Sequence, residues 1–131
     1  MLKLKELIST QKADDALSDL KSHSTQGKEP GSRVYKFPNG YISARVEKYN
    51  NELWLWWQEV EKKYQGKGLG SAFISLLKDI ADKHNVKVRL TPKRYQSHGI
   101  SSDALEQWYT RQGFKMMPGK DRWMIRKPNT H

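Results

Sequence analysis

Three glycines within five residues, Gly66, Gly68 and Gly70, are the feature that most constrains how this chain can fold. Residues 53–57 before them are all large and apolar, which is typical of a buried strand. Apolar residues at helical spacing after them predict a helix over 73–84; these are Leu69, Phe73, Leu76, Leu77 and Ile80. A glycine loop before a helix N-terminus lets backbone N–H groups approach an anion closely. We therefore expect a phosphate or pyrophosphate site; the alternative is a strand–turn–helix corner whose glycines serve packing alone.

Two common phosphate loops do not fit this sequence. A Walker loop requires Gly-Lys followed by Ser or Thr, whereas Lys67 is followed by Gly68. A dinucleotide-binding fold places G-x-G-x-x-G after the first strand of a parallel unit, whereas this G-x-G-x-G comes late, after a predicted antiparallel meander. Binding of a nucleoside triphosphate or of a dinucleotide is therefore disfavoured.

The predicted meander consists of three strands. Residues 33–37 and 41–49 flank a turn at Pro38-Asn39-Gly40, and Asn50-Asn51 predicts a two-residue hairpin turn into the strand 53–57. Strict alternation along that last strand would place Trp54, Trp56 and Val60 on one face and Leu53, Leu55 and Trp57 on the other. Apolar residues on both faces predict a central strand that is covered on both sides.

The two ends of the chain are less strongly patterned. Residues 2–22 predict one or two amphipathic helices with a break near Ser9-Thr10, and the polar residues 22–32 predict a flexible loop. After the central helix, which Asn85 should cap, residues 86–90 predict a strand parallel to the strand 53–57. A short helix that ends at Gly113 and a closing hairpin complete the chain.

The glycine loop also carries a family signature. Gln65-Gly66-Lys67-Gly68-Leu69-Gly70 matches Q/R-x-x-G-x-G/A, and Val60 and Tyr64 upstream match the extended pattern V-x-P-x-Y-R/Q-G-x-G. Lys62 stands where that pattern commonly has proline. In these residues the chain resembles the GNAT (GCN5-related) family of N-acetyltransferases.

A second motif supports this resemblance. Trp108-Tyr109-Thr110-Arg111-Gln112-Gly113-Phe114 is similar to the family's L-Y-x-x-x-G-F, and it lies about forty residues after the glycine loop, in the family's order. The resemblance implies an α/β (α+β) GNAT fold: a mixed, mostly antiparallel sheet with a central splayed parallel strand pair and helices on both faces. It implies one domain over 1–131, with a core over 33–127 and a variable helical part and loop over 1–32. Short phage-type and anti-CRISPR acetyltransferases are nearest in layout.

The resemblance also implies a site for acetyl-CoA. In the family, the thioester lies where the strand before the loop splays from the parallel strand. If this chain follows the family's arrangement, backbone N–H groups of the loop would hold the pyrophosphate, and backbone groups of Glu59 and Val60 would pair with the pantetheine arm. Lys67 either reaches a phosphate or is a solvated loop lysine, and Gln65 is expected to shape the loop. The residues expected to contact the pyrophosphate are Gly66, Lys67, Gly68, Gly70 and Ser71.

Tyr109 matches the family tyrosine that protonates the departing thiolate. A phenol with a pKa of ~10 stays protonated near neutral pH and can act as that acid. The alternative is a core aromatic beside Trp108. Ser102 stands seven residues before Tyr109, where it either contacts the pantetheine arm or caps the short helix.

The general base is left open by the sequence. An incoming ammonium must lose a proton before it attacks, and a carboxylate usually accepts it. Trp54 occupies the family's commonest glutamate position. Glu52, Glu59 and His98 are therefore the candidates, and bulk water is the alternative.

Charge bears on the choice of partner. The 131 residues carry a net charge of +10, and residues 87–131 hold ten basic residues against three acidic ones. Such an excess attracts an acidic macromolecule, such as nucleic acid or a protein bound to it, or serves solubility alone. With no cysteine, no signal-like segment and no long apolar run, we expect a cytoplasmic protein without a metal site or a membrane partner. The oligomeric state stays open, a dimer included.

Three functions compete at this point. The first is acetyl transfer from acetyl-CoA to a primary amine, such as a protein lysine. The second is a non-catalytic module that binds CoA and uses the fold for interaction. The third is a basic nucleic-acid-binding domain, for which the tryptophans would be stacking platforms, although they are better explained as core residues.

Overall fold

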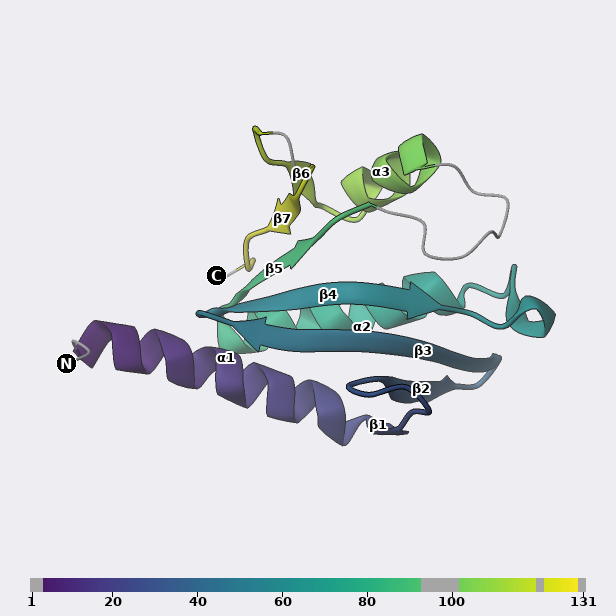
Figure 1. The fold of residues 1–131 in the computed structure, drawn as a ribbon, viewed down its shortest axis with the longest axis horizontal. Coiled ribbons are helices and arrows are strands. Elements are labelled where there is room, and N and C mark those ends of the chain that lie inside the picture. Colours follow the sequence, from purple (N-terminus) through teal and green to yellow (C-terminus); the bar gives the residue numbers. More distant parts are fainter. Residues whose placement is uncertain (1–3, 93–101, 120–121, 130–131) are drawn as a thin grey trace.

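In the part of the chain that the structure describes, one seven-stranded sheet organises the fold, in the order β1-β2-β3-β4-β5-β7-β6 (Figure 1). The computed structural model describes residues 4–92, 102–119 and 122–129, except for the side chains of residues 4–10 and 102. The strands are β1 (Ser24–Gln26), β2 (Arg33–Phe37), β3 (Gly40–Tyr49), β4 (Glu52–Glu59), β5 (Lys87–Leu90), β6 (Lys115–Met116) and β7 (Met124–Arg126). The helices are α1 (Leu4–Ser22), a 3₁₀ turn η1 (Lys62–Tyr64), α2 (Leu69–His84) and α3 (Ser102–Arg111).

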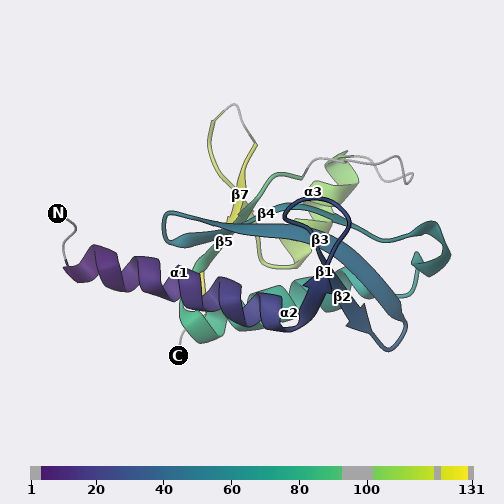
Figure 2. The same cartoon turned by 60° about the horizontal axis from the view of Figure 1, so that its bottom comes forward.

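The hydrophobic core lies between the sheet and the helices α1 and α2, which run side by side (Figure 2). From α2, the large side chains of Phe73, Ile74 and Leu77 are completely buried, and each contributes roughly 1.5–3 kcal/mol by leaving water. From α1, Ala13 and Ala16 are buried, and their small side chains allow a close approach to the neighbouring elements. None of the described helices combines the length and the apolar character that a membrane-spanning helix needs.

Most of the predicted elements are confirmed. Strands β2, β3 and β4 form the antiparallel meander, and β5 pairs in parallel with β4. Asn50 has a φ of 57° in the hairpin turn, and Asn85 has a φ of 58° at the C-terminal cap of α2. Both asparagines adopt the left-handed conformation that this residue tolerates best after glycine.

The N-terminal prediction is wrong in two details. Helix α1 is continuous, without the predicted break at Ser9-Thr10. Part of the predicted flexible loop 22–32 is the short strand β1, which pairs with β2 along the edge of the sheet. The Arg33 guanidinium strengthens this pairing by donating hydrogen bonds to Oγ and the carbonyl oxygen of Ser24, at 2.9 and 3.1 Å. A strand held by its backbone and one arginine needs no alternation of apolar residues, so the sequence pattern did not reveal it.

A β-bulge in β4 overturns the predicted alternation of its side chains. Leu55 lies opposite Val46, but Trp57 lies opposite Arg45, so Trp56 is an extra residue in β4. Directly opposed residues of antiparallel strands point to the same face, so Trp57 shares the face of Arg45 and not that of Leu55.

β4 is a central strand, as predicted, but its coverage is incomplete around Trp54 and Trp56. Trp56 is 43% exposed and has the Arg45 guanidinium stacked over its ring at 5.3 Å. Trp54 is half-buried, and its ring lies 4.7 Å from that of Trp123. On this face of the sheet, aromatic and arginine side chains cover one another in part, and the remaining surface is open to solvent.

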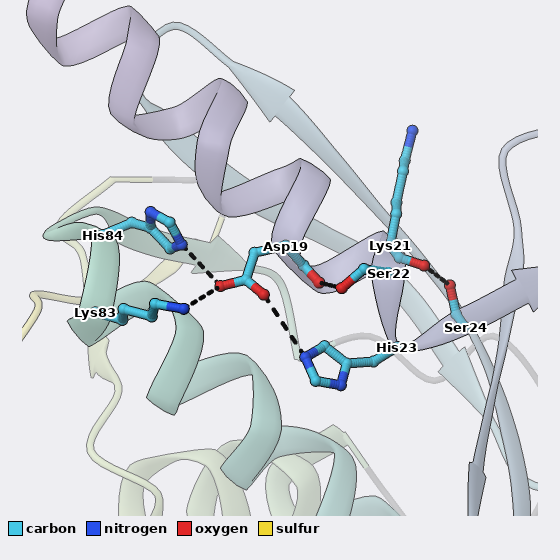
Figure 3. A network of polar contacts seen from close by, with 7 residues as sticks. All are labelled: Asp19, Lys21, Ser22, His23, Ser24, Lys83 and His84. Atoms are coloured by element: carbon cyan, nitrogen blue, oxygen red, sulfur yellow. Dashed lines mark hydrogen bonds and ion pairs between the residues drawn. The ribbon is translucent and has the colours of Figure 1, made fainter.

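A polar network ties α1 to the C-terminal end of α2 (Figure 3). The Asp19 carboxylate lies between the two helices, 2.8 Å from Nε2 of His84 and 3.3 Å from Nζ of Lys83. Its other oxygen lies 3.6 Å from Nε2 of His23. The hydrogen bond with His84 is the main reason why the pKa of Asp19 is lowered from its ordinary value of 3.8.

Asp19→Asn should therefore destabilise the fold. We expect a loss of about 1 kcal/mol at pH 7 and a fall in Tm of a few degrees. Because the pKa of Asp19 is lowered in the folded state, its contribution is fully present above pH 3.8 and is lost as the pH falls through the folded value. Urea unfolding at several pH values measures this, with Asp15→Asn, an exposed position on the same helix, as the control. Equal losses in both variants at pH 7 would contradict the assigned role of the network.

Candidate active site

A groove of about 800 Å³ opens where β4 and β5 separate. The two strands pair only from Glu52 with Lys87 to Leu55 with Leu90. Beyond Leu55 the bulge at Trp56 bends β4, and among the described residues no further pairing joins it to the segment after Leu90. Residues from β4, from the glycine loop and from α3 line the resulting space, most of them apolar or aromatic. A cleft of this size and character, formed where a parallel strand pair splays, is suited to a small-molecule ligand.

The glycine loop closes one end of the groove. Gly66 and Gly68 have φ values of 79° and 76°, which only glycine adopts without strain, and a Cβ atom at either position would meet nothing within 4 Å. The space in front of the loop is therefore open. Gly68 is the N-terminal cap of α2, and no side chain caps the helix. The first N–H groups of α2 have no intrahelical acceptor, so they can serve an anion.

The loop is held in place from behind. The Tyr64 ring packs so closely over Gly40 that a Cβ atom there would lie 2.6 Å from the ring. Gln65 donates a hydrogen bond from Nε2 to the carbonyl oxygen of Val60 at 3.2 Å, which closes the base of the loop. Lys67 is exposed, with Nζ 5.9 Å from the centre of the Tyr64 ring, and Ser71 is exposed in the first turn of α2. Neither Lys67 nor Ser71 is among the residues that line the groove, and Lys62 and Lys63 are exposed in the turn η1.

Tyr109 lies in the wall of the groove, and only 6% of it is exposed. Its ring contacts those of Trp108 and Phe114, with centroids 4.9 and 5.8 Å away. Its hydroxyl accepts a hydrogen bond of 2.7 Å from Nε2 of Gln58. Burial raises the pKa of Tyr109 to about 12, although the hydrogen bond from Gln58 opposes that rise. The phenol therefore carries its proton at neutral pH, and it is both a core residue and a groove residue.

The structure separates the candidates for the base. Glu52 is 9% exposed and does not line the groove. Its carboxylate accepts hydrogen bonds from Nε and Nη2 of Arg89, at 2.9 and 3.2 Å, so Glu52 helps to hold β4 to β5. Glu59 does line the groove, as does the backbone segment that continues into Val60. His98 lies outside the described residues, and Ser102 is the first residue of α3 with its side chain outside them.

Gln58, Glu29 and Trp56 are among the groove residues that were missed in the sequence. Gln58 was overlooked because the strand was expected to end at Trp57, whereas β4 continues to Glu59. Glu29 belongs to the turn between β1 and β2 that was predicted as flexible loop, and Trp56 was assigned to the core. The sequence did contain a signal for Gln58. It forms a polar pair with Glu59 at the end of an apolar run, just before the glycine loop.

Comparisons with known proteins agree with this geometry. No protein-family model matches the chain, and neither does any curated protein sequence. Among solved structures, anti-CRISPR protein AcrVA5 is 29% identical with a TM-score of 0.54, over 72% of this chain and 97% of that one. A GNAT-family acetyltransferase from Listeria monocytogenes is 16% identical with a TM-score of 0.52, over 95% and 89% of the two chains. The ribosomal-protein-S18-alanine N-acetyltransferase from Escherichia coli is 18% identical with a TM-score of 0.51, over 95% and 87%.

The chain therefore has the GNAT fold, as its two motifs predicted. The mixed sheet with one splayed parallel pair is the shared feature, and the glycine loop and Tyr109 stand at that splay in this chain. Solved N-acetyltransferases are among the structures that share this fold.

Proposed function

We propose that this protein transfers an acetyl group from acetyl-CoA to a primary amine. The observation that carries the proposal is the arrangement of the groove. An open helix N-terminus lies at one end of it, and a buried, protonated tyrosine lies in its wall. The GNAT fold of the chain supports the same reaction class.

The residues present fit acetyl-CoA. The uncapped first turn of α2, with open space before Gly66 and Gly68 and the exposed Lys67 between them, suits the pyrophosphate. The edge of β4 beyond Leu55, which β5 no longer covers, suits an extended arm laid alongside it as an added strand. When bound, acetyl-CoA supplies an acetyl group activated as a thioester.

The residues of the chain then have distinct tasks. The amine nitrogen attacks the thioester carbonyl carbon, the C–S bond breaks, and the sulfur departs with the electron pair. Tyr109 is the only described tyrosine that combines deep burial with a place in the groove wall, and its hydroxyl proton stabilises the departing sulfur. Glu59, which lines the groove, would accept the proton that the ammonium loses, directly or through water.

Binding of acetyl-CoA should depend on Gly70. A Cβ atom at this position would be 3.8 Å from the Trp108 ring, an ordinary contact, and a carboxylate in the first turn favours the helix, so Gly70→Glu should fold. Its negative charge would occupy the pyrophosphate site, and we expect binding in calorimetry to fall below detection. Ser75→Glu adds the same charge at an exposed position of α2 and should bind normally. A wild type that ignores CoA would refute the proposed function.

Turnover should depend on the Tyr109 hydroxyl. Tyr109→Phe keeps the ring contacts, so the fold and the affinity for acetyl-CoA should persist while kcat falls at least about tenfold. Tyr35→Phe is the matched control, because Tyr35 is equally buried and its pKa is likewise raised to about 12 by burial, but it does not line the groove. Steady-state kinetics with a saturating amine separate the two. Full turnover by the Tyr109 variant would leave this residue a packing role only.

For the acceptor we propose an amine on an acidic macromolecule, such as a lysine of a protein associated with nucleic acid. The net charge of +10 supports this choice. Some of the basic residues are paired with acidic ones within the chain, since Arg89 pairs with Glu52, Arg122 with Glu106 and Arg126 with Asp82. Lys87, Lys115 and Lys127 are exposed on β5, β6 and the end of the closing hairpin, where they can face a polyanion.

Reversal of these three lysines should weaken the acceptor alone. In the triple variant Lys87→Glu, Lys115→Glu and Lys127→Glu, KM for the macromolecular acceptor should rise and should lose its dependence on salt, while KM for acetyl-CoA stays constant. The control reverses Lys21, Lys28 and Lys36, which are exposed in the N-terminal part. Initial rates between about 50 and 200 mM salt test this. A salt-independent KM in the wild type would limit the charge to a role in solubility.

A further inference from the structure

Gln58 is the polar residue that links the two walls of the groove. It lies in β4 opposite the fully buried Ala44, so its side chain points to the helix-covered face. From there Nε2 reaches the Tyr109 hydroxyl of α3 at 2.7 Å, across 51 residues of sequence. Neither residue could be placed against the other without the bulge, which sets the register of β4 beyond Leu55.

The other end of the amide is unpaired. Within the described part of the chain, Oε1 of Gln58 is buried without a hydrogen-bond partner, and no other buried side-chain oxygen or nitrogen shares this condition. A buried acceptor without a partner costs about 1–3 kcal/mol, and such groups are rare in native proteins. An apolar side chain of the same length would pack at this position without that cost. Stability therefore does not explain an amide at this position.

The direction of the hydrogen bond decides what the Tyr109 proton can do. A phenol oxygen has one O–H to donate and lone pairs with which to accept. Because Nε2 of Gln58 donates to this oxygen, the hydroxyl proton is not used by Gln58 and is left for the groove. If the amide presented an acceptor instead, the proton would be held in the wall.

We propose that Gln58 is a positioning residue for Tyr109: its amide N–H orients the phenol so that the hydroxyl proton points to the sulfur leaving group in the groove. This role rests on the proposed acetyl transfer. It also affects acid strength, because a hydrogen bond donated to the phenol oxygen favours the phenolate and so opposes the effect of burial. A thiol of the usual acidity has a pKa of ~8.5, so a donor whose pKa lies closer to that value shares its proton with the sulfur more readily.

Gln58→Met and Gln58→Glu test the role from two sides. The methionine side chain has similar length and no amide, so kcat should fall about tenfold, the rate equivalent of one neutral hydrogen bond, with an unchanged KM for acetyl-CoA. Because the substitution also removes an unpaired buried acceptor, Tm should stay constant or rise. A residue with a purely structural role would show the reverse, a lower Tm with unchanged kcat. The glutamate variant offers a carboxylate that accepts the Tyr109 proton, and its kcat should fall further.

A double-mutant cycle shows whether Gln58 acts through Tyr109. In a Tyr109→Phe background the hydroxyl is gone, so Gln58→Met should cause no further loss of kcat. An equal loss in both backgrounds would overturn the proposal, as would full turnover by Gln58→Met. Both results would leave acetyl transfer by the wild type intact, so they are distinct from a failure of the proposed function.

A measurement without turnover completes the test. With tyrosines labelled by ¹³C at Cζ, the Tyr109 resonance is identified by its loss in Tyr109→Phe, and Gln58→Met should shift it while the other resonances stay in place. An unmoved resonance would show that the hydrogen bond is absent and would overturn the proposal. If the wild-type protein acetylates no amine, neither Gln58 nor Tyr109 has a catalytic role, even if the Tyr109 resonance shifts as expected.

Discussion

The separation of β4 from β5 is the constraint on which the rest of the site depends. All four residues of β5 pair with β4, and at the next position of β4 one extra residue, Trp56, bends the strand. The bend opens the groove, and it also changes which side chains face it. Trp57 moves to the face of Arg45, and Gln58 turns toward α3 and Tyr109. One inserted residue therefore produces both the cavity and the polar contact within it.

Helix α2 is held firmly at one end and left open at the other. Its C-terminal end is fixed by the Asp19 carboxylate and by the pair between Asp82 and Arg126, at 2.8 and 3.0 Å, which lowers the pKa of Asp82. Its N-terminal end has neither a side-chain cap nor an acidic residue in the first turn. The positive end of the helix dipole thus remains uncompensated at the groove, where a phosphate group would be stabilised.

The sequence reveals those parts of the site that have local causes. Glycines with left-handed backbone at 66 and 68, the helix behind them and the tyrosine before Gly113 all follow from short motifs. The bulge cannot be predicted from the sequence. Residues 54, 56 and 57 are all tryptophan, so strand registers with and without the extra residue both place apolar side chains on the two faces. The role of Glu52 depends on Arg89, 37 residues away, and the hydrogen bond of Gln58 depends on Tyr109, 51 residues away. Such contacts are set by tertiary structure, which single-sequence patterns do not encode.

The placement of the aromatic residues has an optical consequence. Trp56, Trp57 and Trp108 line the groove, the Trp54 ring lies 6.4 Å from that of Trp56 and 4.7 Å from that of Trp123, and these are all five tryptophans of the chain. Indole emission depends strongly on the polarity and the charges near the ring, and here no tryptophan lies far from the groove to dilute the signal. The intrinsic fluorescence of this protein therefore originates almost entirely from the region that a ligand would occupy, so the unlabelled chain carries its own reporter of occupancy.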